Sequence, residues 1–269
     1  MTDSTSLRLT WEVLPILTQK RNYMNLFPVY PLFDVEIVKG QGCQVWDSEG
    51  QAYLDLYGGH AVISIGHCHP HYVRKMQEQV AQLGFYSNSV HNKLQERLAE
   101  RLGRACGYPD YSLFLINSGA EANEGAIKCA RKYSVTTYGP DRNKVLTLVN
   151  SFHGRTLATL TATGQDVFHR DFGPFPGNFA YVAANDFDAL KAAADDTVCA
   201  VMMEMVQGEG GVVALDPDYV HQVESFCRER DILIVVDEVQ TGVGRTGTFL
   251  CCEHYNLKPD VVTLAKGLG

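Results

Sequence analysis

Five short segments of the sequence are apolar at nearly every position, and this feature limits the possible folds most strongly. A strand with one solvent-exposed face alternates apolar and polar residues, whereas a strand covered on both faces does not. The segments therefore predict strands of a parallel sheet buried between layers of helices. They cover residues 111–117, 144–150, 198–206, 232–237 and 261–265.

Helical and antiparallel patterns occupy the remaining stretches. Apolar residues recur three and four positions apart over residues 72–83 and 94–105, and residues 120–133 predict a further helix. Asp216 and Pro217 are typical of a helix N-terminus. Residues 35–56 contain short alternating runs around turn residues, which predict antiparallel strands. The expected fold class is α/β, a mainly parallel sheet flanked by helices, with part of a smaller α+β domain formed by residues 1–60.

Composition excludes several classes of function. The 269 residues carry a net charge of −8 without a Lys/Arg block, which argues against binding of nucleic acid or an anionic membrane. No apolar stretch approaches a membrane span, and the N-terminus lacks a signal-peptide layout, so we expect a cytoplasmic protein. The eight cysteines form no C-x-x-C pair and predict reduced thiols. Pro70 interrupts the alternating His67, His69 and His71, and we expect no metal site.

Chemically useful residues follow each of the five predicted strands. Because ligands bind beyond the carboxyl ends of parallel strands, we expect these residues to converge. Ser118 and Glu121 also form the S-x-x-E pattern of a helix N-cap. In chain order the set is Ser118, Gly119 and Ala120; Phe152 and Arg155; Glu204 and Glu209; Asp237, Glu238, Val239 and Gln240; and Lys266.

This set of residues suits pyridoxal 5′-phosphate. Backbone N–H groups at the start of "SGAEANE" can bind a phosphate. Phe152 offers a flat apolar partner for the ring, and Asp237 a partly desolvated carboxylate for the pyridine nitrogen. Lys266 supplies the amine that forms a Schiff base with the aldehyde. Each residue alone also has an ordinary structural explanation, but together they are chemically complementary.

The stretch "GVGRTG" (residues 242–247) raises an alternative, because it matches G-x-G-x-x-G. A dinucleotide-binding fingerprint requires a strand directly before it and a helix directly after it. Residues 238–241 separate it from the preceding strand, and residues 246–255 lack helical periodicity. We therefore set aside a nicotinamide-dependent dehydrogenase.

Five stretches resemble the class III, fold-type I, pyridoxal-phosphate aminotransferases: "NSGAEANEGAIKCARK", "SFHGRT", "EMVQGEGG", "VVDEVQTGVGRTG" and "LAKGLG". The acetylornithine, succinylornithine and ornithine branch is nearest in pattern. The resemblance covers about residues 24–269 and implies a homodimer with its active site at the subunit interface. It also implies roles for individual residues: Gly119 and Ala120 at the phosphate, Phe152 on the ring, Asp237 at the pyridine nitrogen, Gln240 near the ring hydroxyl, Lys266 at the aldehyde, Arg155 on a substrate carboxylate, and Glu209 paired with a later arginine. Ser118, Glu238 and Val239 complete the predicted cofactor site.

Two departures from the family pattern affect these expectations. The family continues well past the lysine, so we expect residues 61–269 to be an incomplete cofactor-binding large domain and the chain to be C-terminally truncated. His60 differs from the residues usual at its position, which leaves the amino donor open.

The resemblance implies a transamination, with homologous enzymes serving arginine biosynthesis. The expected reaction transfers the terminal amine of an N-acetyl- or N-succinylornithine to 2-oxoglutarate, giving the semialdehyde and glutamate. One alternative is an ornithine δ-aminotransferase or a 4-aminobutyrate-type enzyme, and another is an aminomutase or decarboxylase of the same fold. A third is that residues 1–269 form a catalytically inactive fragment.

Overall fold

The computed structural model describes residues 29–30 and 32–268. The chain divides into two compact units, residues 1–36 and 37–269, and all helices and strands described below belong to the second. The expected contribution of residues 1–60 to a small domain lies partly outside the described residues and stays a prediction. None of the described helices has the length and apolar character needed to cross a membrane.

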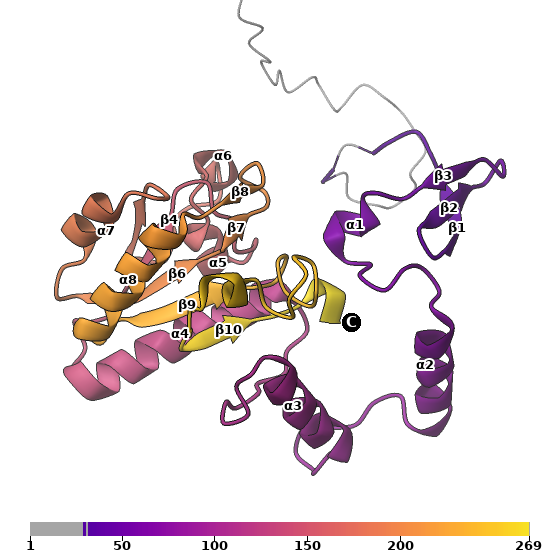
Figure 1. The fold of residues 1–269 in the computed structure, drawn as a ribbon, viewed down its shortest axis with the longest axis horizontal. Coiled ribbons are helices and arrows are strands. Elements are labelled where there is room, and N and C mark those ends of the chain that lie inside the picture. Colours follow the sequence, from indigo (N-terminus) through magenta and orange to yellow (C-terminus); the bar gives the residue numbers. More distant parts are fainter. Residues whose placement is uncertain (1–28, 31, 269) are drawn as a thin grey trace, which may run out of the picture. The chain divides into compact units, whose positions relative to one another are not determined.

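A five-stranded parallel sheet forms the core of the second unit (Figure 1). Its strand order is β10-β9-β6-β4-β5, so the predicted parallel sheet is confirmed. All six residues of β6 are buried, which explains why this segment shows no alternation. The strands are β4 (Lys144–Leu148), β5 (Phe179–Val182), β6 (Val198–Met203), β9 (Leu233–Asp237) and β10 (Val261–Thr263).

Helices cover both faces of this sheet (Figure 1). On one face α7 (Phe187–Ala193) and α8 (Pro217–Glu229) pack on alternate strand residues such as Val201 and Ile234. On the other face α4 (Gly119–Tyr138) packs on the intervening residues such as Met202 and Val235. Successive residues of one strand therefore enter different cores, as the pleat of a strand requires.

The order of the strands creates a crevice at their carboxyl ends. From β4 the chain passes to β5 on one side and then to β6 on the other side of β4. Connections that leave in opposite directions open a gap above the two neighbouring strands, and ligands bind there. The ends of β4 and β6 thus define the expected position of a site.

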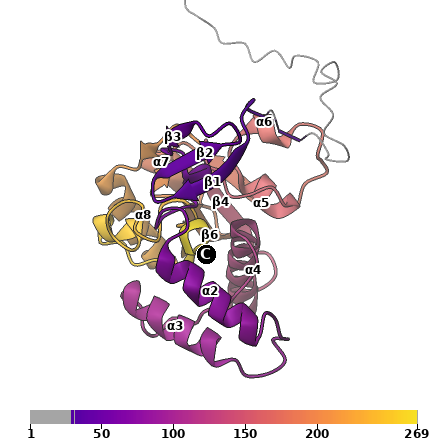
Figure 2. The ribbon, with the colours of Figure 1, turned by 90° about the vertical axis from the view of Figure 1, so that its right-hand side faces the viewer.

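Among the other elements, the antiparallel strands predicted over residues 35–56 and the helices predicted over 72–83 and 94–105 are confirmed (Figure 2). An antiparallel sheet joins β1, β2 and β3, and Pro70 stands in the first turn of α2, with Asp216 as the N-cap of α8. The remaining bounds are β1 (Ile37–Gln41), β2 (Gln44–Asp47), β3 (Ala52–Leu54), α1 (Gly58–Ala61), α2 (Pro70–Gln82), α3 (Lys93–Ala105), α5 (Leu157–Ala162), α6 (Asp166–His169), β7 (Val206–Gln207), β8 (Val213–Ala214), and 3-10 helices at Cys251–Tyr255 and Lys266–Leu268.

One predicted strand is wrong. Residues 111–117 contain no strand, and Phe114 is 74% exposed. A strand needs a hydrogen-bonded neighbour, and β10 at the edge of the sheet pairs only with β9 in the part of the chain that the structure describes. The predicted strand over 198–206 is also shorter, because β6 ends at Met203.

Candidate functional site

A cavity at the carboxyl ends of β4, β6, β9 and β10 brings together most of the predicted site residues. Nine of the twelve line it, whereas Ser118, Arg155 and Glu238 do not. Asn123, His153 and Gly154 line it as well and were not predicted as site residues. The full lining is Gly119, Ala120, Asn123, Phe152, His153, Gly154, Glu204, Glu209, Asp237, Val239, Gln240 and Lys266.

The N-terminus of α4 forms one wall of this cavity. Ser118 is the N-cap, and its Oγ accepts a hydrogen bond from the Glu121 amide at 3.2 Å, which confirms the predicted cap. The Glu121 carboxylate accepts from the Asn117 amide at 2.6 Å instead of returning to Ser118. A Cβ atom on Gly119 would lie 2.7 Å from Val239 Cγ1, so only glycine permits this close approach of the helix. Backbone N–H groups at a helix N-terminus suit a phosphate.

Asp237, at the end of β9, is 3% exposed and held by several donors. Its Oδ2 accepts from Asn123 Nδ2 at 2.7 Å and lies 2.8 Å from His153 Nδ1. Its Oδ1 accepts from the Val239 amide at 3.0 Å. Both Asn123 and His153 lie within the stretches that resemble the family. Asn123 comes one helical turn after Gly119, and His153 is next to Phe152, and these positions could have identified them.

Glu204 adds a second buried carboxyl group at the end of β6. Its Oε2 accepts from the Phe152 amide at 3.1 Å, which joins the ends of β4 and β6 across the crevice. Burial raises the pKa of Glu204 to about 7, and the positive charge on His153 opposes this shift. Burial alone would lower the pKa of His153, but its hydrogen bond to Asp237 and the carboxylate charge together raise it. A positively charged His153 can therefore stabilise the Asp237 carboxylate inside the protein.

Lys266 follows β10 and lines the same cavity. Partial burial lowers the pKa of its ammonium group, although Glu209 and Asp237 act in the opposite direction. The lower pKa favours the neutral amine, which is the nucleophilic form. Lys266 also has φ of +48°, a left-handed conformation that costs free energy in residues other than glycine and is frequent at functional sites.

The other predicted residues occupy different positions around the cavity. The Arg155 guanidinium carbon lies 5.7 Å from the centre of the Phe152 ring. Gln240 Nε2 donates to Glu209 Oε1 at 3.5 Å, and both residues line the cavity. The fully buried Glu238 instead accepts from the Cys252 amide at 2.8 Å and from the Thr241 hydroxyl. The Glu238 side chain therefore holds the neighbouring loop together.

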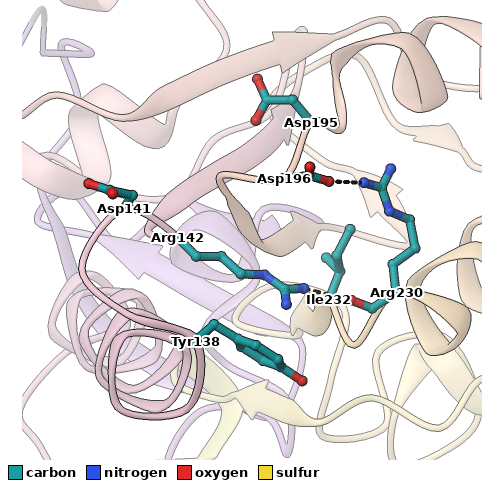
Figure 3. Close-up of a pocket in the computed structure, with 7 residues that line it drawn as sticks. All are labelled: Tyr138, Asp141, Arg142, Asp195, Asp196, Arg230 and Ile232. Carbon is teal, nitrogen blue, oxygen red and sulfur yellow. Dashed lines mark hydrogen bonds and ion pairs between the residues drawn. The ribbon is translucent and has the colours of Figure 1, made fainter.

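A second cavity lies at the opposite, amino ends of the strands (Figure 3). Arg142 donates to the carbonyls of Val198, Arg230 and Asp231, and it lies over the Tyr138 ring at 4.1 Å. Both arginines of this cavity use their N–H groups on backbone carbonyls or on Asp196, so we assign the cluster a structural role. Across the described residues, no three His, Cys, Asp or Glu side chains are grouped to hold a metal ion.

Comparisons with known proteins identify the family of this chain. The family model for "Aminotransferase class-III" matches residues 28–269. The acetylornithine aminotransferase of Caldanaerobacter subterraneus is 49% identical over 94% of this chain and 64% of its own length, and that of Haemophilus ducreyi is 48% identical over 89% and 61%. The chain thus spans about 60% of the length of these curated relatives.

Solved structures show the same fold. The N-acetylornithine aminotransferase of Stenotrophomonas maltophilia has a TM-score of 0.77 and 38% identity, over 89% of this chain and 60% of its own. The ornithine aminotransferase of Toxoplasma gondii has a TM-score of 0.85 and 34% identity, over 90% and 57%. The fold, the residues gathered at the strand ends and the match over nearly the whole chain establish that this chain belongs to the class-III aminotransferase family.

Proposed function

We propose that the whole protein is a pyridoxal-phosphate-dependent aminotransferase that moves the terminal amine of an N-acylornithine to 2-oxoglutarate. The observation that carries this proposal is the meeting of Gly119, Phe152, Asp237 and Lys266 in one cavity at the switch point of the sheet. The printed names of the curated relatives favour N-acetylornithine as the donor. The products would be the semialdehyde and glutamate.

The residues of the cavity fit the cofactor. The helix N-terminus at Gly119 has no side chain in the way of a phosphate, and the buried Asp237 carboxylate would pair with the pyridine nitrogen. Lys266 provides the amine that would hold the aldehyde end. When bound, this cofactor supplies an electron sink for negative charge at the substrate carbon that carries the amine.

The side chains of this chain perform the remaining tasks. Asp237, held by Asn123 and His153, would keep a proton at the ring nitrogen. The neutral amine of Lys266 can accept a proton from the substrate carbon and return it, as a general base and acid does. Glu204 would keep Phe152 in place through the backbone amide of that residue.

Substrate selection would depend on Arg155 and Glu209. A guanidinium binds a carboxylate through two parallel hydrogen bonds, which a lysine cannot reproduce. We infer that Arg155 binds the substrate carboxylate and that Glu209 pairs with an arginine located later in the protein. A cytoplasmic homodimer serving arginine biosynthesis is part of the same proposal. The second candidate is an ornithine aminotransferase, because the Toxoplasma gondii enzyme has a similar structure.

The absorbance spectrum of the full-length protein with pyridoxal phosphate tests the proposal. We expect a visible band that is absent in Lys266→Ala and is bleached by one donor among N-acetylornithine, N-succinylornithine and ornithine. The donor that bleaches the band identifies the substrate. If the full-length protein gives no lysine-dependent band, the proposed cofactor role is wrong.

A further inference from the structure

The short helix α6 (Asp166–His169) places Phe168 beside two residues of the proposed site. The Phe168 and Phe152 ring centres are 5.6 Å apart with an angle of 72° between the planes, an edge-to-face contact. The Arg155 guanidinium carbon lies 4.9 Å from the Phe168 ring centre and 5.7 Å from that of Phe152. Each of these three side chains thus contacts the other two.

Hydrogen bonds attach the segment that carries Phe168 to the loop after β4. Gln165 Nε2 donates to the Ser151 carbonyl at 3.0 Å, and the Asn150 amide donates to the Gly164 carbonyl at 2.8 Å. On the other side, the His169 ring nitrogen Nε2 lies 2.8 Å from the Leu160 carbonyl oxygen. Phe168 therefore projects from a segment that is fixed to the same loop that carries Phe152 and Arg155.

This geometry affects how Arg155 can act. An exposed arginine has many rotamers, and binding a carboxylate in a two-point contact requires it to give up that freedom. A guanidinium attracted to the faces of two rings is already restricted before the ligand arrives. The edge-to-face contact between Phe168 and Phe152 also limits the tilt of the Phe152 ring, which is proposed to stack on the cofactor.

We propose that Phe168 is a positioning residue that orients Arg155 for binding the substrate carboxylate and supports the ring of Phe152. This inference rests on the proposed function, since it assigns Arg155 a carboxylate ligand. Phe168 itself would not touch the substrate, and its effect would pass through Arg155 and Phe152.

Glutarate, a dicarboxylate without an amine, serves as the binding probe for the full-length protein. Its Kd is measured by calorimetry, with and without pyridoxal phosphate, for wild type, Phe168→Leu and Phe168→Tyr. We expect Phe168→Leu to raise this Kd about fivefold, and Phe168→Tyr, which keeps the ring, to stay within about twofold of wild type. Val167→Ala is the control, because Val167 lies on the same helix with its side chain 58% exposed.

A double-mutant cycle with Arg155→Ala separates positioning from a general structural effect. In the Arg155→Ala background, Phe168→Leu is expected to cause no further change in the Kd of glutarate. Kinetics give a second readout. Phe168→Leu should raise KM for N-acetylornithine more than it lowers kcat, and it should leave KM for n-butylamine, which has no carboxylate, unchanged.

Several results would overturn the inference. Equal effects of Phe168→Leu with and without Arg155, or equal effects on both amines, would show a purely structural role. If wild type bound no glutarate, or Arg155→Ala bound it normally, the carboxylate site itself would be wrong, and the lysine-dependent absorbance band would show whether the cofactor role survives. Should Phe168→Leu fail to fold, Phe168→Met replaces it, because methionine fills a similar volume without a ring.

Discussion

At the level of single residues, the buried carboxyl group of Glu204 makes the stability of the fold depend on pH. Its pKa in the folded protein is about 7, above the ordinary value of 4.5, so the fold favours the protonated form. The contribution of protonated Glu204 to the free energy of unfolding is fully present below about pH 4.5 and is lost as the pH rises through about 7. Above that pH the protein contains two buried carboxylates beside one histidine.

Glu204→Gln should remove this dependence. When the pH is raised from 5 to 8, wild type should lose about 2–3 kcal/mol more of its free energy of unfolding than the variant does. Urea denaturation of both proteins at both pH values measures this difference. Glu229→Gln, on the exposed end of α8, is the matched control and should show no such change. Parallel pH profiles of Glu204→Gln and wild type would contradict the prediction.

Gly119 gives a second prediction at this scale. Alanine normally stabilises a helix relative to glycine by about 1 kcal/mol, but its Cβ here would meet Val239 at 2.7 Å. We expect Gly119→Ala to raise the Kd for pyridoxal phosphate about tenfold, because the helix N-terminus must move. The double variant Gly119→Ala with Val239→Ala removes the clash with Val239, leaves the 3.3 Å approach to Ala265 Cβ, and should recover most of the affinity, as measured by cofactor titration. No recovery would mean that the clash is not the cause.

At the level of elements, the twenty-residue α4 connects the site to the core of the sheet. Its N-terminus lines the cavity, and Ala126, Ile127 and Ala130 pack on one face of the strands. The position of the helix therefore depends on packing, and its first turn depends on the cap at Ser118.

Ser118→Ala should destabilise the protein by about 1 kcal/mol, because the Glu121 amide loses its acceptor. Ser118→Thr keeps a hydroxyl acceptor, so its free energy of unfolding should lie within about 0.5 kcal/mol of that of wild type. Urea denaturation of the three proteins tests this. Equal losses in both variants would show that the cap bond does not stabilise α4.

At the level of the whole molecule, the two ends of the sheet have different tasks. The residues proposed for chemistry lie at the carboxyl ends of the strands, whereas Arg142 connects the segments around their amino ends (Figure 3). Its three hydrogen bonds reach carbonyls of β6 and of the turn between α8 and β9. The removal of Arg142 should therefore affect stability and leave the site unchanged.

Arg142→Met keeps the length of the side chain and removes these donors. We expect a loss of about 2–3 kcal/mol in the free energy of unfolding, with the Kd for pyridoxal phosphate unchanged under conditions where the protein is folded. Arg74→Met is the control: Arg74 is exposed on α2, where it contacts His71 and lies 3.8 Å from the Glu78 carboxylate, so its removal should cost less than about 0.5 kcal/mol. A large change in cofactor affinity in Arg142→Met would contradict the separation of the two ends.

The sequence by itself determined four strands of the parallel sheet, a helix on each of its faces and the carboxyl-end position of Phe152, Asp237 and Lys266. These features could be predicted because burial on two faces leaves a continuous apolar run, and because the residue after a buried strand has a known position at the edge of the sheet. Local patterns of this kind need no knowledge of which strands are neighbours.

The tertiary structure alone decided which strands are neighbours and which side chains meet. The reversal at β4 brings Glu204 to the Phe152 amide, and α6 brings Phe168 to Arg155; neither contact has a local signal. The apolar pattern of residues 111–117 predicts a strand, but this segment has no strand partner among the described residues. The prediction fails because strand pairing depends on distant parts of the chain. The burial of a strand can thus be predicted from its local sequence, whereas contacts between distant segments depend on how the whole chain packs.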